Sequence, residues 1–139
     1  MNKFCKLFVV VLAVFLASCT NNPSSVEPKE VDYEHEIADY TQTIRIEPNY
    51  ADAYNKRDGI AYSNKGDDDR AIADYTQAIR IEPNNANAYN NRGNVYNNKG
   101  DYERAIADFN QVIRIEPNFA NAKERLEMAK RALRWEKMK

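Results

Sequence analysis

Apolar residues are distributed in two contrasting ways along this chain. Near the N-terminus they form one unbroken run, from Leu7 to Ala17, whereas from residue 31 onward they recur every three or four positions. Such spacing places apolar side chains on one face of an α-helix. The pattern therefore predicts a short apolar segment followed by a series of amphipathic helices.

The amphipathic part of the chain repeats itself. The segments IADYTQTIRIEPN, IADYTQAIRIEPN and IADFNQVIRIEPN end at Asn49, Asn84 and Asn118, so the period is 35 and then 34 residues. Proline cannot continue a helix, and the Lys-Gly-Asp sequences suit a helix end followed by the N-cap of the next helix. Each period therefore holds two helices, and a period of this length marks stacked helix pairs.

The expected helices alternate between two kinds. First helices are predicted at Ala51–Asn64 and Ala86–Asn98, and second helices at Asp68–Ile81 and Tyr102–Ile115. In the second helices the apolar residues recur at helical spacing and predict the core. In one copy these residues are Ala71, Ile72, Tyr75, Ala78 and Ile79.

The repeat resembles the tetratricopeptide repeat. The family's signature falls on Tyr89, Gly93, Tyr96, Ala105, Phe109 and Pro117 in one copy, and on Tyr54, Gly59, Tyr62, Ala71, Tyr75 and Pro83 in the preceding copy. Arg57 and Arg92 stand where the family usually has leucine. The resemblance implies an all-α fold, a short right-handed superhelical stack of antiparallel helix pairs with a C-terminal capping helix.

The pattern divides the chain into four parts. These are an N-terminal signal segment (1–18), a polar tether that begins at Cys19 (19–31), the repeats (32–118) and a capping helix (119–139). Within the repeats we expect a half repeat and two full repeats, at 32–49, 50–84 and 85–118. One extra residue near Asp58 rotates the helix by about 100°, which predicts a π-bulge or a break at residues 57–61.

The half repeat lacks a first helix to cover it. Glu36 stands where the other copies have alanine, a substitution we expect to be tolerated because no partner helix crosses there. One apolar face is covered on one side only, so it is a candidate docking or homodimer surface, and simple exposure is the alternative. That face consists of Tyr33, Ile37, Tyr40 and Ile44.

The N-terminal segment has the features of a secretory signal. Lys3 and Lys6 precede the apolar run, which is too short to span a bilayer. The sequence Leu16-Ala17-Ser18-Cys19 resembles the lipobox of bacterial lipoproteins. That resemblance implies cleavage before Cys19 and acylation of its sulfur, and therefore a bacterial membrane, the outer membrane facing the periplasm in a two-membrane cell. The alternative is a secretory signal with an accidental cysteine.

Binding in the tetratricopeptide family occurs on the concave surface that the first helices line. Transferred to this chain, the resemblance assigns that groove to Asn87, Asn90, Asn94, Asn97, Asp52, Asn55, Asn121 and Arg125. Asparagine both donates and accepts hydrogen bonds, so the row suits a peptide. Asparagine tolerated on a solvated face is the alternative. No lysine stands beside these asparagines, which argues against the carboxylate-clamping activity of some family members.

Charge and composition exclude other classes of function. With 20 basic and 21 acidic residues the chain lacks the basic excess of a nucleic-acid binder. His35 is the only histidine, and no metal cluster, phosphate loop or nucleophile motif is present, so we expect no enzyme, metal or cofactor. From Lys123 onward the chain carries seven basic and three acidic residues, net +4, while residues 19–122 carry net −7.

Three functions are therefore left open. The first is a membrane-anchored adaptor that binds a protein or peptide in the bacterial cell envelope. The second is a structural factor that assembles pilus or outer-membrane machinery through self-association. The third is a truncated remnant of a larger repeat protein.

Overall fold

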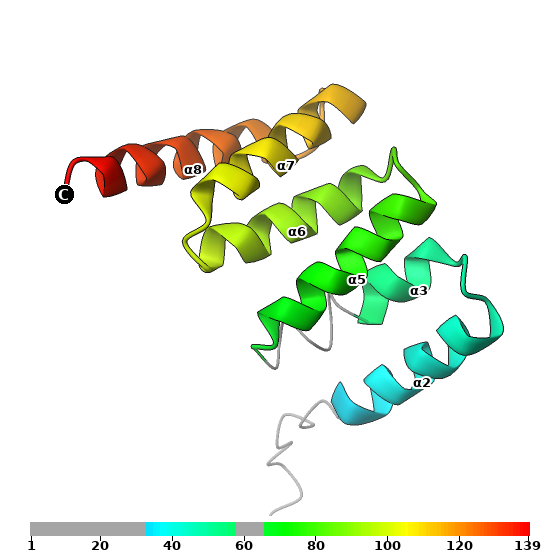
Figure 1. The fold of residues 1–139 in the computed structure, drawn as a ribbon. Coiled ribbons are helices and arrows are strands. Elements are labelled where there is room, and N and C mark those ends of the chain that lie inside the picture. The colour runs from blue at the N-terminus through cyan, green and yellow to red at the C-terminus, as the bar shows by residue number, and fades with distance from the viewer. Residues whose placement is uncertain (1–32, 58–65) are drawn as a thin grey trace, which may run out of the picture. The chain divides into compact units, whose positions relative to one another are not determined.

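The computed structural model describes residues 33–57 and 66–139. They lie in the second of two compact units, Asp32–Lys139. All regular structure in the described residues is helical, as Figure 1 shows. The helices are α2 (Tyr33–Ile46), α3 (Ala51–Lys56), α5 (Asp68–Ile81), α6 (Ala86–Asn98), α7 (Tyr102–Ile115) and α8 (Ala122–Lys137). The predicted bounds of α5, α6 and α7 are confirmed.

Residues that cap helices set the start of each full second helix. The side chain of Asp101 accepts a hydrogen bond from the backbone N–H of Arg104 at 3.2 Å, and Asp67 does the same for Arg70 at 3.4 Å. Just before them, Gly66 and Gly100 have φ values of 74° and 78°, where a side chain would be strained. The Lys-Gly-Asp sequences therefore turn the chain between helices as predicted.

Helix α2 packs on α3, and α3 packs on α5. From α5 to α8, each helix packs on the next one in the sequence. All described helices except α2 contribute buried residues to the core, and the second helices supply its largest fully buried side chains, Tyr75, Phe109 and Val112. Gly93 of α6 lies against α7, and a Cβ there would stand 3.0 Å from Cε1 of Phe109. The small residue therefore permits the closest approach of a helix pair.

Helix α2 has no buried residue, as a half repeat without a first helix predicts. Ile37 packs partly against the core cluster of Ala71, Tyr75 and Val95. Glu36, which we expect to be tolerated because no partner helix crosses there, is half-buried, and its Oε2 is buried without a hydrogen bond from any described residue. Self-association through this face stays a prediction.

The predicted irregularity near Asp58 falls at the edge of the described residues. Helix α3 ends at Lys56, and Arg57 adopts a π-helical turn. The remainder of the predicted break, residues 58–61, lies outside the described residues, as does the end of the first helix predicted at 51–64.

Helix α8 covers the exposed side of the last repeat. Leu126 and Ala129 are buried in a cluster with Tyr96, Ala105 and Phe109, and Ala122 is buried against Val112 and Ala86. The face that turns away from this cluster carries charged residues. The helix therefore occupies the position of a further first helix, as the capping prediction requires.

Candidate functional site

A hollow of about 490 Å³ lies between α6 and the first half of α8. It brings together four of the eight predicted groove residues, which come from two helices that are distant in sequence. Its lining consists of Asn94, Asn97, Asn98, Asn121, Glu124, Arg125 and Met128. The amides donate and accept, Arg125 and Glu124 supply one charge of each sign, and Met128 adds an adaptable apolar contact.

Asn90, a predicted groove residue, is buried and does not line the hollow. Its side chain is only 6% exposed, and its Oδ1 accepts a hydrogen bond from Nη1 of Arg125 at 2.8 Å. Its Nδ2 donates to Oδ1 of Asn91 at 3.3 Å. Asn90 therefore orients the guanidinium of Arg125 within the hollow and is not itself available to a ligand.

The remaining predicted residues do not line this hollow. Asn87 is exposed in the first turn of α6, about two turns before the lining residues begin at Asn94. On α3, Asp52 is exposed, while Asn55 is half-buried and its Oδ1 is buried without a hydrogen bond from a described residue. Ligand binding by any of these residues stays a prediction.

The two arginines at the family's leucine position form buried clamps that the sequence reading missed. Arg92 of α6 donates from Nε and Nη2 to the two carboxylate oxygens of Asp108 on α7, at 2.9 and 2.8 Å. Its Nη1 donates to Oγ1 of Thr76 on α5 at 2.9 Å. One guanidinium therefore joins three helices and two repeats.

The same arrangement recurs one repeat earlier. Arg57 donates to both oxygens of Asp74 at 2.5 Å and to Oγ1 of Thr41 at 3.1 Å. The equivalent arginines and threonines lie 35 positions apart and the equivalent aspartates 34. This recurrence is the signal that the sequence carries, but it does not show that the three side chains meet.

Both clamps are largely buried, so the pairing of their charges affects the stability of the fold. The side chains of Arg92 and Asp108 are 16% and 7% exposed. Burial by itself lowers the pKa of Arg92, but the hydrogen bond and the charge of Asp108 outweigh it and raise that pKa above its ordinary value. The rings of Tyr89 and Tyr96 lie 5.6 and 5.9 Å from the guanidinium carbon and add cation–π attraction. Arg92 is therefore held in its charged form.

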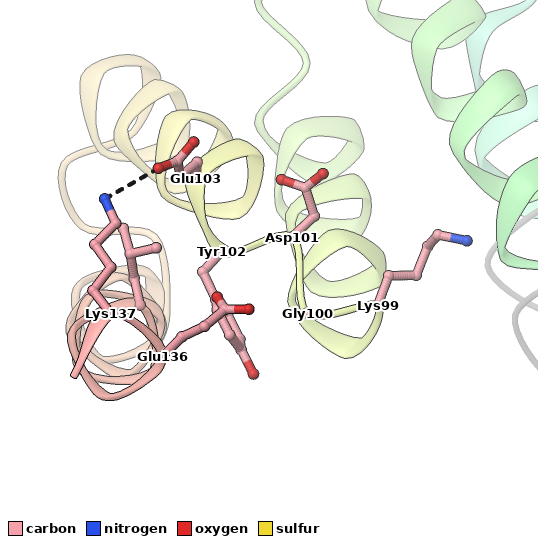
Figure 2. Close-up of a pocket in the computed structure, with 8 residues that line it drawn as sticks. Lys99, Gly100, Asp101, Tyr102, Glu103, Glu136 and Lys137 are labelled. Atoms are coloured by element: carbon pink, nitrogen blue, oxygen red, sulfur yellow. Dashed lines mark hydrogen bonds and ion pairs between the residues drawn. The ribbon is translucent and has the colours of Figure 1, made fainter. Parts of the chain in front are cut away.

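A second hollow, of about 420 Å³, lies where the α6–α7 turn meets the end of α8 (Figure 2). Figure 2 shows Lys137 of α8 directed toward Glu103 of α7, and their charged atoms are 3.2 Å apart. Lys99 pairs with Asp69 at 2.9 Å, and Asp101 pairs with Arg104. These charges are already matched within the protein, so this hollow is a helix junction with no assigned ligand.

Neither a metal cluster nor a membrane-spanning helix is found within the described residues. No group of histidine, cysteine or carboxylate side chains within 33–57 and 66–139 is arranged to hold a metal ion. His35 lies on α2 with Nε2 3.6 Å from Asp39, and both side chains are mostly exposed. None of the described helices is long and apolar enough to cross a membrane.

The stacked pairs and the hollow between first helices place this chain among the helix-pair repeat proteins. The profile described as "Tetratricopeptide repeat" matches residues 86–119, and the one described as "TPR repeat" matches residues 59–100. The chain belongs to the tetratricopeptide repeat family. No curated protein sequence matches it significantly.

Solved structures agree with this assignment. The first TPR of Spaghetti (RPAP3) bound to the HSP90 peptide SRMEEVD is 26% identical, with 73% of this chain and 79% of that chain covered and a TM-score of 0.70. The second TPR domain of human RPAP3, in complex with the HSP70 peptide SGPTIEEVD, is 30% identical, with 70% and 81% covered and a TM-score of 0.66. The Sgt2 TPR domain from Aspergillus fumigatus is 27% identical, with 77% and 72% covered and a TM-score of 0.71.

Proposed function

We propose that this chain is a non-catalytic adaptor that binds a protein or peptide and is held at a bacterial envelope membrane by a lipid on Cys19. The observation that carries the binding part is the hollow between α6 and α8, where separate helices supply amides and a buried residue orients Arg125. Two similar TPR structures carry bound peptides, which supports peptide binding by this chain.

The chemistry of the hollow favours an extended, polar peptide. Peptide backbones present alternating donors and acceptors, and Asn94, Asn97 and Asn121 can satisfy both. Glu124 and Arg125 lie side by side in sequence and contribute opposite charges, so an acidic side chain of the ligand pairs with Arg125 and a basic one with Glu124. The apolar thioether of Met128 completes the lining with an adaptable contact.

The groove is tested by photocrosslinking in intact cells with a reactive residue at Asn98. Asn94→Ala/Asn97→Ala removes two amides from the lining, and each lost hydrogen bond weakens binding by about 0.5–1.5 kcal/mol. We expect crosslinked partner to fall between about five-fold and a hundred-fold. The matched control is Asn84→Ala/Asn118→Ala, which removes two exposed asparagines from the turns between helices. Equal recovery from the two variants would exclude the groove.

The anchor rests on the lipobox resemblance and has its own test. Cells that express the full chain are fed an alkyne analogue of palmitate, and the label on the protein is compared between variants. Cys19→Ser is expected to abolish labelling, whereas Cys5→Ser retains it, because the chain has only these two cysteines and Cys5 lies before the cleavage site. An unlabelled wild-type chain would instead indicate an ordinary secretory signal.

A further inference from the structure

The last two turns of α8 expose an unusual mixture of side chains on one face. Arg131, Arg134, Trp135 and Met138 are spaced i, i+3, i+4 and i+7, which places them on a single helical stripe, and all four are exposed. Trp135 is 63% exposed and Met138 is 73% exposed. We call these four residues the α8 stripe.

The stripe points away from the body of the repeats. The residues of α8 that pack against α7 are Ala122, Leu126 and Ala129, on the opposite side of the helix. Lys137 is occupied with Glu103 of α7, as Figure 2 shows, so it belongs to the helix junction and not to the stripe. No described helix covers the indole of Trp135.

Charge around the stripe is strongly asymmetric. Residues 131–139 hold four basic residues and one acidic residue, net +3, whereas residues 19–122 carry net −7. An anionic surface would therefore attract the end of α8 and repel most of the rest of the chain. This asymmetry sets the orientation in which the chain would approach such a surface.

We propose that the α8 stripe binds the surface of a membrane that contains anionic lipid. Trp135 would lie at the level of the headgroups, where indole rings are favoured, and Met138 would enter the acyl boundary. Arg131 and Arg134 would pair with lipid phosphates while their methylene stems lie along the boundary. The proposal concerns the C-terminal helix and does not depend on the groove or on Cys19.

The size of the stripe favours a membrane over a protein partner. The exposed apolar area of Trp135 and Met138 is on the order of 250 Å², since a whole aromatic side chain presents about 150–250 Å². A stable protein interface needs about 800 Å² from each partner. A lipid surface requires no matching shape, so a small apolar wedge flanked by cations is sufficient for a weak contact.

Trp135 is the only tryptophan of the chain, so its fluorescence reports on this contact alone. The full chain is reconstituted into vesicles of phosphatidylcholine, or of phosphatidylcholine mixed with phosphatidylglycerol, with brominated acyl chains in parallel samples. The N-terminal residues, including Lys3 and Lys6, are the same in every variant, so a difference between variants in the same lipid arises from the substituted positions. We expect a shift to shorter wavelength, and quenching by bromine, only with anionic lipid.

Arg131→Glu/Arg134→Glu replaces both cations of the stripe and should weaken the contact at least about thirty-fold, from ~1 kcal/mol for each cation near an anionic surface. Arg80→Glu/Arg114→Glu changes the net charge equally at exposed ends of α5 and α7 and should retain the shift. In the unmodified chain, raising NaCl from about 0.02 to about 0.5 M should reverse the shift through screening, which needs no variant. The absence of any shift with anionic lipid, or an equal shift with phosphatidylcholine alone, would overturn the proposal.

Discussion

Replacing Asp108 with alanine is expected to lower the free energy of unfolding by about 3–5 kcal/mol, because it leaves the buried guanidinium of Arg92 without its carboxylate. The side chain of Arg92 is only 16% exposed, so water cannot replace the lost partner. Urea denaturation followed by far-UV circular dichroism measures the change. A domain of this size has a total stability of the same order, so loss of the folded baseline is an equivalent result.

Two companion variants test whether the burial of the Arg92–Asp108 pair, and not the position of Asp108 in the repeat, determines the loss of stability. Asp39 of α2 occupies the register of Asp108 but has a 69% exposed side chain, so Asp39→Ala is expected to change stability by less than about 1 kcal/mol. Arg92→Leu/Asp108→Leu removes both charges together and should cost less than Asp108→Ala alone. Equal losses from Asp39→Ala and Asp108→Ala would show that burial of the clamp contributes nothing.

Phe109→Ala is expected to destabilise the protein by about 3–5 kcal/mol, the usual range for a buried aromatic side chain. Phe109 is 1% exposed, and its ring fills the space against which Gly93 packs, so its removal leaves a cavity between α6 and α7. Thermal unfolding and hydrogen exchange of α6 and α7 amides measure the effect.

The half repeat again supplies the matched control. Tyr40 of α2 lies at the register of Phe109 but is only half-buried by the described residues. Tyr40→Ala is therefore expected to cost less than about half as much as Phe109→Ala. If both substitutions cost the same, the face of α2 must be covered by something that the described residues do not include.

Much of this fold could be predicted because its determinants are local. Proline after Ile81 and Ile115, and glycine with aspartate before α5 and α7, define helix ends through backbone geometry that neighbouring residues alone decide. The period then assigns each helix its partner, because every repeat makes the same contacts. The groove residues came from the resemblance to the tetratricopeptide repeat, and four of the eight line one hollow.

The clamps and the role of Asn90 could not be predicted in this way, because they depend on contacts between helices. Arg92 meets Asp108 and Thr76 from positions 16 residues away on either side, and no local pattern indicates that three polar groups will converge in the core. Asn90 shares the helical spacing of Asn94, yet Arg125 covers it. Its burial depends on how closely α8 packs, which spacing within α6 does not reveal.

The last helix junction, between α7 and α8, lacks the arginine clamp. Leu126 and Asn110 stand in α8 and α7 where earlier repeats have arginine and threonine. Helix α8 is attached through apolar packing, the hydrogen bond from Arg125 to Asn90 and a surface ion pair. Separation of α6 from its neighbours would leave the buried charge of Arg92 without its partner Asp108, whereas α8 can separate without that cost. The stack is therefore joined into one cooperative block up to α7 and followed by a segment that can open locally. Because the hollow lies between that block and that segment, occupancy by a ligand would slow amide exchange in α8 first.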